Sequence, residues 1–269
     1  MMGQAGCITM AQPTVGDLVS AVTTIAPALI PISENEEIAI GRDIAANVAG
    51  RYGVVQDYGL TRYVNLVGNT VARKSDRPNL KYHFAVLDTD IVNAFACPGG
   101  YVFITRGTLN LIESESELAA VLAHEVAHVA KKHIVKEIEK TKLLMAGGRV
   151  AGDLINTGSQ VFEAVTSLGT DILFKGLSRS DEYQADRFSL IYASGAGYEP
   201  IGLITFLEKL RLEGNRPGSE GVALLFSTHP KVDDRLTRAS GIINELSLND
   251  YQGVSLPDRY KANIRSIGY

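Results

Sequence analysis

The stretch that decides the fold reads Glu115-Ser-Glu-Leu-Ala-Ala-Val-Leu-Ala-His-Glu-Val-Ala-His-Val-Ala-Lys-Lys-His133, with neither proline nor glycine inside it. Ser114 precedes it and Glu117 follows three residues later, a capping-box spacing that predicts the start of a helix. From 118 to 130, nearly every residue outside the embedded His124-Glu-x-x-His128 is apolar. We therefore expect a helix that is buried on most sides, with the lysines after Ala130 carrying its end into solvent.

The embedded motif places two histidines four residues apart. Over that interval a helix rises about 6 Å and turns about 40°, so the imidazoles of His124 and His128 point to one side and can grip one metal ion. Glu125 would sit beside the metal, placed to take a proton from a metal-bound water. Three fixed letters make a weak pattern, but two histidines and a glutamate are costly to bury without partners. The burial therefore favours a metal site over a core cluster of satisfied polar groups.

Composition bounds the class of protein. With 269 residues, 45% hydrophobic and 21% charged, the chain is long enough for one large globular domain. The net charge of −4 and the lack of a basic run with interleaved aromatics give no support for nucleic-acid binding. Two cysteines, Cys7 and Cys97, are too few for a disulfide framework. No apolar run approaches the roughly 18–20 residues that a membrane span needs.

The first residues leave two interpretations open. Residues 1–11 lack the charged and apolar regions of a signal peptide, yet Gln4-Ala5-Gly6-Cys7 is similar to the tail of a bacterial lipoprotein cleavage site. Either the numbering begins inside a trimmed leader and Cys7 carries lipid, or Cys7 is an ordinary thiol in a loose terminus.

The remaining periodicity predicts a chain of helices around a few strands. We expect strands at 81–87, 91–97 and 101–105, joined by a turn at Pro98-Gly-Gly. We expect helices at 33–51, 60–73, 107–112, 178–193, from 200 past 210, and from 230 to about 246, with a loop at 213–221 and a glycine-rich, loosely helical stretch at 141–176. We divide the chain into an N-terminal segment (1–32), one main domain (33–246) and a C-terminal tail (247–269) packed on or near it.

A third metal ligand is needed if one position is to stay open for water. The metzincin pattern is excluded, because Lys131 and Ile134 stand where it requires Gly and His. His133 lies half a turn from the motif's side and is expected to be solvated. Glu182 and Asp186, one helical turn apart in a later helix, supply the alternative: one can bind the metal while the other accepts the N–H of a ligating imidazole.

Several motifs in order identify the chain as similar to a known family. They are Asn93-Ala-Phe-Ala, Pro98-Gly-Gly-Tyr-Val, Gly107-Thr-Leu, His124-Glu-x-x-His128, Ser178-Arg-x-x-Glu182-x-x-Ala-Asp186 and Ser227-Thr-His-Pro-x-x-x-x-Arg235. The chain resembles the HtpX and CAAX-prenyl-protease family of gluzincin metallopeptidases, above all its soluble BepA-like and LoiP-like branch. The resemblance implies an α+β, mostly helical zincin fold with a small sheet, whose edge strand lies above the active-site helix.

The resemblance also implies a role for each matching residue. It makes His124, His128 and Glu182 the ligands of one zinc ion per chain, Glu125 the general base, and Asp186 the acceptor that orients a ligating histidine. The edge strand formed by Asn93, Ala94, Phe95 and Ala96 would pair with a substrate peptide.

His229 and Arg235 match an element near the metal, where either can stabilise the oxyanion of the tetrahedral intermediate. Alternatively, His229 only caps the helix expected at Pro230. A further expectation is that the resting enzyme is restrained, either by His229 on the metal's open position or by the glycine-rich segment from Gly147 to Gly176 acting as a lid.

The function implied is a zinc-dependent metalloendopeptidase that cleaves peptide or unfolded protein substrates in envelope protein quality control. An extracytoplasmic location with peripheral or lipid-anchored membrane association goes with it. The alternative is a zinc-bearing assembly or chaperone-like factor with latent proteolysis. The lack of spans argues against prenylated substrates, and the lack of a tetratricopeptide pattern argues against a built-in partner-binding array.

Overall fold

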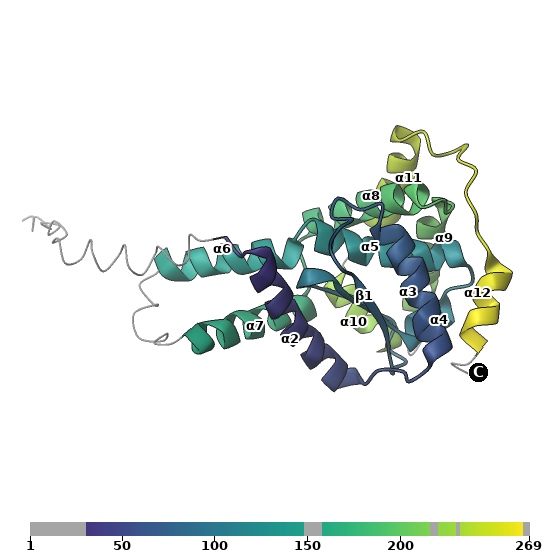
Figure 1. Ribbon diagram of the computed structural model, residues 1–269. Coiled ribbons are helices and arrows are strands. Elements are labelled where there is room, and N and C mark those ends of the chain that lie inside the picture. Colours follow the sequence, from purple (N-terminus) through teal and green to yellow (C-terminus); the bar gives the residue numbers. More distant parts are fainter. Residues whose placement is uncertain (1–30, 148–157, 216–219, 230–231, 266–269) are drawn as a thin grey trace, which may run out of the picture.

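The computed structural model of the chain describes residues 31–147, 158–215, 220–229 and 232–265. Its helices are α2 (Glu34–Tyr52), α3 (Tyr58–Ala72), α4 (Arg106–Leu111), α5 (Glu115–Ala130), α6 (His133–Gly147), α7 (Gly158–Lys175), α8 (Arg179–Gly195), α9 (Ile201–Gly214), α10 (Glu220–Thr228), α11 (Val232–Glu245) and α12 (Pro257–Ile264). The strands are β1 (His83–Leu87), β2 (Ala94–Cys97) and β3 (Tyr101–Thr105), with a 3-10 turn, η1 (Pro98–Gly100). The described fold is α+β and mostly helical, which confirms the expected fold class (Figure 1).

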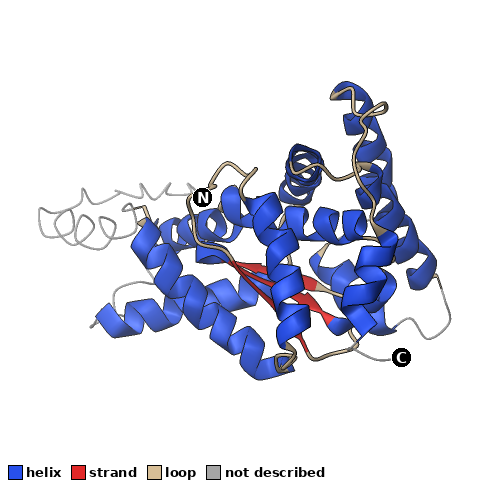
Figure 2. Ribbon diagram, turned by 45° about the vertical axis from the view of Figure 1, so that its right-hand side comes forward, coloured by secondary structure: helices blue, strands red, loops and turns tan. Residues whose placement is uncertain are grey.

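The three strands form one small sheet in the order β1-β3-β2. β3 is parallel to β1 and antiparallel to β2, with Phe95 opposite Phe103 in the second pair. The sheet lies among the helices (Figure 2) and leaves β2 as an edge strand, as expected. The β2–β3 turn requires glycine, because Gly100 has φ +96° and a Cβ there would lie 2.5 Å from the backbone oxygen of Lys81.

The motif helix α5 is the centre of the fold, and all of its residues are buried. The Ser114 hydroxyl accepts the Glu117 N–H and caps the helix start. Helices α3, α8 and α9 pack around it, and β2 crosses it. A helix this apolar on every side is stable only when neighbours cover it fully, so α5 sets the positions of the elements around it.

The end of α5 differs from the sequence expectation. The helix stops at Ala130, Lys132 adopts a left-handed φ of 58°, and a new helix, α6, begins at His133. The change of direction leaves His133 only 2% exposed, so the expected solvated histidine is wrong. Lys132 is not simply solvated either, since its Nζ lies 3.1 Å from the buried carboxylate of Glu37 on α2.

Two C-terminal helices had no sequence prediction. α10 begins in the last two residues of the expected loop and continues through residues that had no prediction, and its Val222 and Leu225 are buried in the main core. α12 packs on α3 and α5, where the Arg259 guanidinium contacts the buried carboxylate of Glu115 and the Tyr260 hydroxyl donates to the Leu109 carbonyl.

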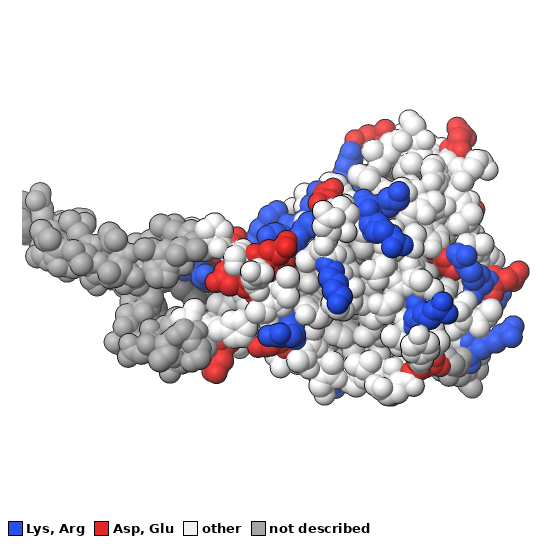
Figure 3. Space-filling model, viewed as in Figure 1, with Lys and Arg blue, Asp and Glu red and all other residues white. Residues whose placement is uncertain are grey.

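The surface carries no marked excess of one charge on the face that Figure 3 shows, where basic and acidic side chains are interspersed. Within the described ranges, none of the helices combines the length and the apolar character needed to cross a membrane. Cys7 and Pro230 lie outside the described residues, so the interpretations that depend on them are not addressed by the fold.

Candidate metal centre

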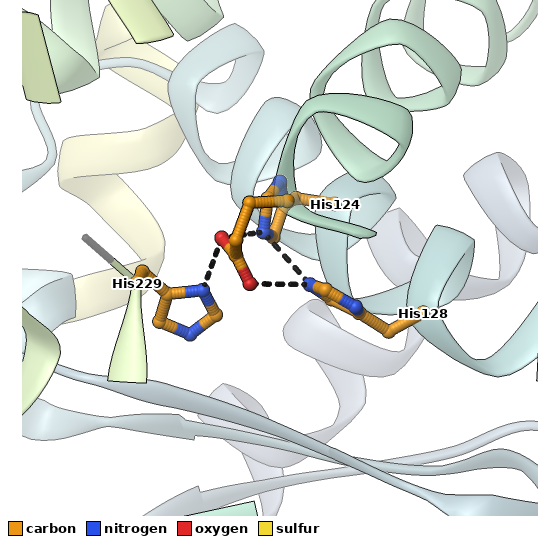
Figure 4. A group of neighbouring side chains, drawn as sticks. His124, His128 and His229 are labelled. Atoms are coloured by element: carbon orange, nitrogen blue, oxygen red, sulfur yellow. Dashed lines mark hydrogen bonds and ion pairs between the residues drawn. The ribbon is translucent and has the colours of Figure 1, made fainter. Parts of the chain in front are cut away.

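Three separate segments bring four side chains to one point beside α5. His124 and His128 project from α5, Glu182 from the first turn of α8, and His229 from the residue that follows α10. One ligand atom from each lies within 4.8 Å of all the others, and Figure 4 shows the three imidazoles turned toward a shared carboxylate. The structure therefore brings together both motif histidines, the distant glutamate and His229.

The distances within this cluster are short. The Nε2 atoms of His124 and His128 lie 3.0 Å apart. The Glu182 carboxylate places Oε2 at 3.5 Å from His124 Nε2 and Oε1 at 3.5 Å from His128 Nε2. Oε2 also lies 2.7 Å from His229 Nδ1. Glu182 Oε1 is buried and has no hydrogen-bond partner among the described residues, which is costly for a carboxylate unless a cation satisfies it.

The charges at the cluster favour a cation. Burial alone would raise the pKa of Glu182, but His229 and His124 hold it well below its ordinary value. Burial lowers the pKa of His128 well below the usual range. Burial and Arg235 also oppose protonation of His124, yet the carboxylates of Asp186 and Glu182 raise its pKa to about 9. An ionised carboxylate among buried imidazoles thus attracts positive charge, and these donors fit a metal ion.

Asp186 lies behind His124, on the side away from the cluster. Its Oδ1 is 3.0 Å from His124 Nδ1, and the aspartate is fully buried. Arg235 on α11 binds both carboxylate oxygens, with Nε 2.9 Å from Oδ2 and Nη2 2.7 Å from Oδ1. The guanidinium group therefore pairs mainly with Asp186, and its Nη1 lies 3.9 Å from Glu182 Oε2.

Glu125 is buried beside the cluster and lines two small cavities that flank the cluster. Burial raises the pKa of the Glu125 carboxyl, although His229 and His124 oppose the shift. The larger cavity is also lined by apolar side chains of α5 and α9, among them Val121 and Phe206. His229 lines both cavities and therefore stands between them.

The edge strand passes along the same cavities. Asn93 and Ala94 line the larger one, whereas Ala94, Phe95 and Ala96 line the smaller one. Asn93 is fully buried, and within the part of the chain that the structure describes its Nδ2 has no hydrogen-bond partner. All four residues are buried, and α7 packs against β2.

Sequence reasoning missed the contribution of two residues near the site, His133 and Gln184. His133 Nδ1 lies 2.8 Å from His128 Nδ1, and His133 Nε2 lies 2.9 Å from Gln184 Oε1. A straight helix would have turned His133 away, so the reversal at Lys132 brings it back. A positive φ is uncommon for a residue other than glycine, so the sequence does not indicate the left-handed conformation of Lys132.

Comparisons with known proteins agree with this arrangement. Residues 60–243 match peptidase family M48. The chain is 27% identical to the beta-barrel assembly-enhancing protease of Yersinia pestis, with 98% of this chain and 54% of that protein covered. It is 30% identical to the mitochondrial metalloendopeptidase OMA1 of Schizosaccharomyces pombe, with 77% and 61% covered. It is 29% identical to the metalloprotease LoiP of Escherichia coli K12, with 65% and 66% covered.

The chain spans about half the length of the beta-barrel assembly-enhancing proteases that it matches. The family match itself covers more than half of the chain and includes the motif helix, Glu182 and Arg235. This chain belongs to peptidase family M48.

Proposed function

We propose that the chain is a zinc metalloendopeptidase whose metal is held by His124, His128 and Glu182. The spacing of the donor atoms supports zinc most directly. Ligands about 2.0–2.1 Å from a tetrahedral zinc lie about 3.3–3.4 Å from one another. Among these three residues, the two imidazole Nε2 atoms lie 3.0 Å apart, and each lies 3.5 Å from one oxygen of the Glu182 carboxylate, close to the edges of such a tetrahedron.

The surrounding residues divide the chemistry of peptide hydrolysis. When bound, zinc would polarise the scissile carbonyl and acidify water. The Glu125 carboxylate takes a proton from the attacking water and returns it to the leaving amine. Asp186 accepts the Nδ1–H of His124 and so keeps its Nε2 free as a donor, while Arg235 neutralises Asp186 and holds its carboxylate in place.

A chelation experiment tests this function. Purified protein should cleave casein, lose that activity when a zinc chelator is added, and regain it when zinc is returned. Cleavage that persists after the metal is removed, with zinc absent by mass spectrometry, would mean that the activity does not belong to this site.

Peptide binding would follow the edge strand. β2 is the sheet edge, and the buried Asn93 Nδ2 offers an unused donor to a substrate carbonyl. We expect Asn93→Ala to lower kcat/KM for a peptide by about 2- to 10-fold, since one hydrogen bond contributes about 0.5–1.5 kcal/mol. Asn47→Ala on the exposed face of α2 is the control. Equal rates for the two variants would remove Asn93 from substrate binding.

His229 offers a way to restrain the resting enzyme. Its imidazole belongs to the donor cluster and separates the two cavities, so it can hold the metal's fourth position against water. We expect His229→Ala to raise basal casein cleavage several-fold with its zinc retained. A large loss of turnover with unchanged zinc would instead make His229 an oxyanion donor.

The glycine-rich segment offers the other restraint. The C-terminal end of α7 is packed, with Ile172 and Leu173 buried, and Leu173 and Gly176 line the smaller cavity. Residues 148–157 lie outside the described structure. If deletion of the Gly147–Gly176 segment alone raises activity, the lid accounts for restraint better than His229 does.

We place this activity in envelope protein quality control, outside the cytoplasm, with unfolded proteins as substrates. One relative is named a beta-barrel assembly-enhancing protease, and this name supports the envelope setting. Another is named metalloprotease LoiP, which supports the proteolytic activity. The alternative, an assembly factor with latent proteolysis, would share the same ligands. Fractionation of cells and mass spectrometry of the native N-terminus test the location and the lipid on Cys7, and an unprocessed cytosolic protein would refute both.

A further inference from the structure

The second motif histidine presents its two ring nitrogens to different partners. His128 Nε2 faces the donor cluster, 3.0 Å from His124 Nε2 and 3.5 Å from Glu182 Oε1. Its Nδ1 lies on the opposite side of the ring, 2.8 Å from the Nδ1 of His133. The two rings meet nearly edge to face, at an interplanar angle of 75°. His128 is therefore held from behind by an imidazole, whereas His124 is held by the Asp186 carboxylate.

Among the described residues, the other ring nitrogen of His133 has one partner at hydrogen-bond distance. Its Nε2 lies 2.9 Å from Gln184 Oε1 on α8. The nearest acidic atom is farther away, with Asp181 Oδ1 at 3.8 Å. His133 is 2% exposed, so protein groups satisfy both of its nitrogens. Gln184 on α8, His133 at the start of α6 and His128 on α5 thus form one hydrogen-bonded row. This row connects the break after α5 to the metal site.

Only one arrangement of protons lets His128 bind a metal through Nε2 in this row. A ligating nitrogen must be unprotonated, so the proton of His128 stands on Nδ1. That N–H needs an acceptor, which makes His133 Nδ1 unprotonated and places the His133 proton on Nε2. The Nε2–H then donates to the amide oxygen of Gln184, and an amide oxygen can only accept.

We propose that His133 and Gln184 are positioning residues that fix the tautomer and ring orientation of His128 for metal binding. The inference rests on the proposed metal site. The neutral row also suits the charges around it. Arg235 compensates Asp186 behind His124, whereas no guanidinium stands behind His128 among the described residues. A neutral acceptor there orients the ligand without burying a carboxylate that lacks a compensating cation.

Metal affinity tests the role of His133. Zinc binding is measured by competition with a chromophoric chelator of known affinity, on the full chain, with circular dichroism as the check on folding. We expect His133→Phe to weaken zinc binding about 10- to 100-fold, because it leaves the His128 N–H buried without an acceptor. His133→Asn places an oxygen near the former Nδ1 and should stay within a few-fold of wild type. His83→Phe, an exposed histidine on β1, is the matched control and should bind zinc like wild type.

The position of the protons is a readout that a merely structural role would not move. Nitrogen-15 histidine spectra of the zinc-loaded wild type should show His128 protonated at Nδ1 and His133 at Nε2. This measurement also decides the matter if His133→Phe fails to fold. A His133 proton on Nδ1, or equal zinc affinity in wild type and His133→Phe, would overturn this inference and leave the metal site standing. Wild type that binds no zinc would overturn the metal site, and this inference with it.

Discussion

Glu125→Gln should abolish peptide hydrolysis while the fold and the zinc remain. Glutamine nearly matches glutamate in shape, but its amide cannot take a proton from water. Loss of a general base lowers turnover on the order of a hundredfold or more. Glu125 is buried and lines both cavities beside the donor cluster, which places its carboxylate next to the metal ligands. Casein and peptide cleavage rates, measured with zinc content and circular dichroism, check the expectation.

The control for this variant is Glu208→Gln on the exposed side of α9. It makes the same chemical change away from the site and should leave the rate unchanged. Activity of Glu125→Gln within a few-fold of wild type would assign the base to another group.

The second large effect is expected on stability. The donor atoms of His124, His128 and Glu182 converge only when α5 and α8 are packed together, so zinc binds the folded chain and not the unfolded one. At free zinc about a thousandfold above its dissociation constant, this linkage contributes about 4 kcal/mol to the free energy of unfolding. Chelation should therefore lower the Tm of wild type. In a His124→Ala/His128→Ala variant, adding or removing zinc should leave the Tm unchanged, and a zinc-dependent Tm in that variant would place the metal elsewhere.

The parts of this site that could be predicted depend on local spacing. The motif helix, its cap at Ser114 and the shared face of His124 and His128 follow from a repeat of 3.6 residues. The Glu182 and Asp186 pair was recognisable because one helical turn separates the two carboxylates. Their placement against α5 needed the packing of α8 and could be expected only through the family resemblance.

The parts that were missed depend on breaks and on distant contacts. His133 was expected in solvent because the lysines after Ala130 suit a helix end, and nothing in the sequence marks the left-handed Lys132. α10 is nine residues long, and an apolar run of that length is ambiguous without a cap. Arg235 was expected near the metal, but its two-pronged contact with Asp186 joins residues 49 positions apart, which no local pattern encodes.

Zinc content measures the central claim most directly. Wild-type protein, purified without added metal and analysed by inductively coupled plasma mass spectrometry, should contain about one equivalent of zinc per chain. The His124→Ala/His128→Ala variant, folded by circular dichroism, should contain essentially none. Wild type without zinc, or a variant that retains the full equivalent, would contradict the assignment of His124, His128 and Glu182 as the ligands.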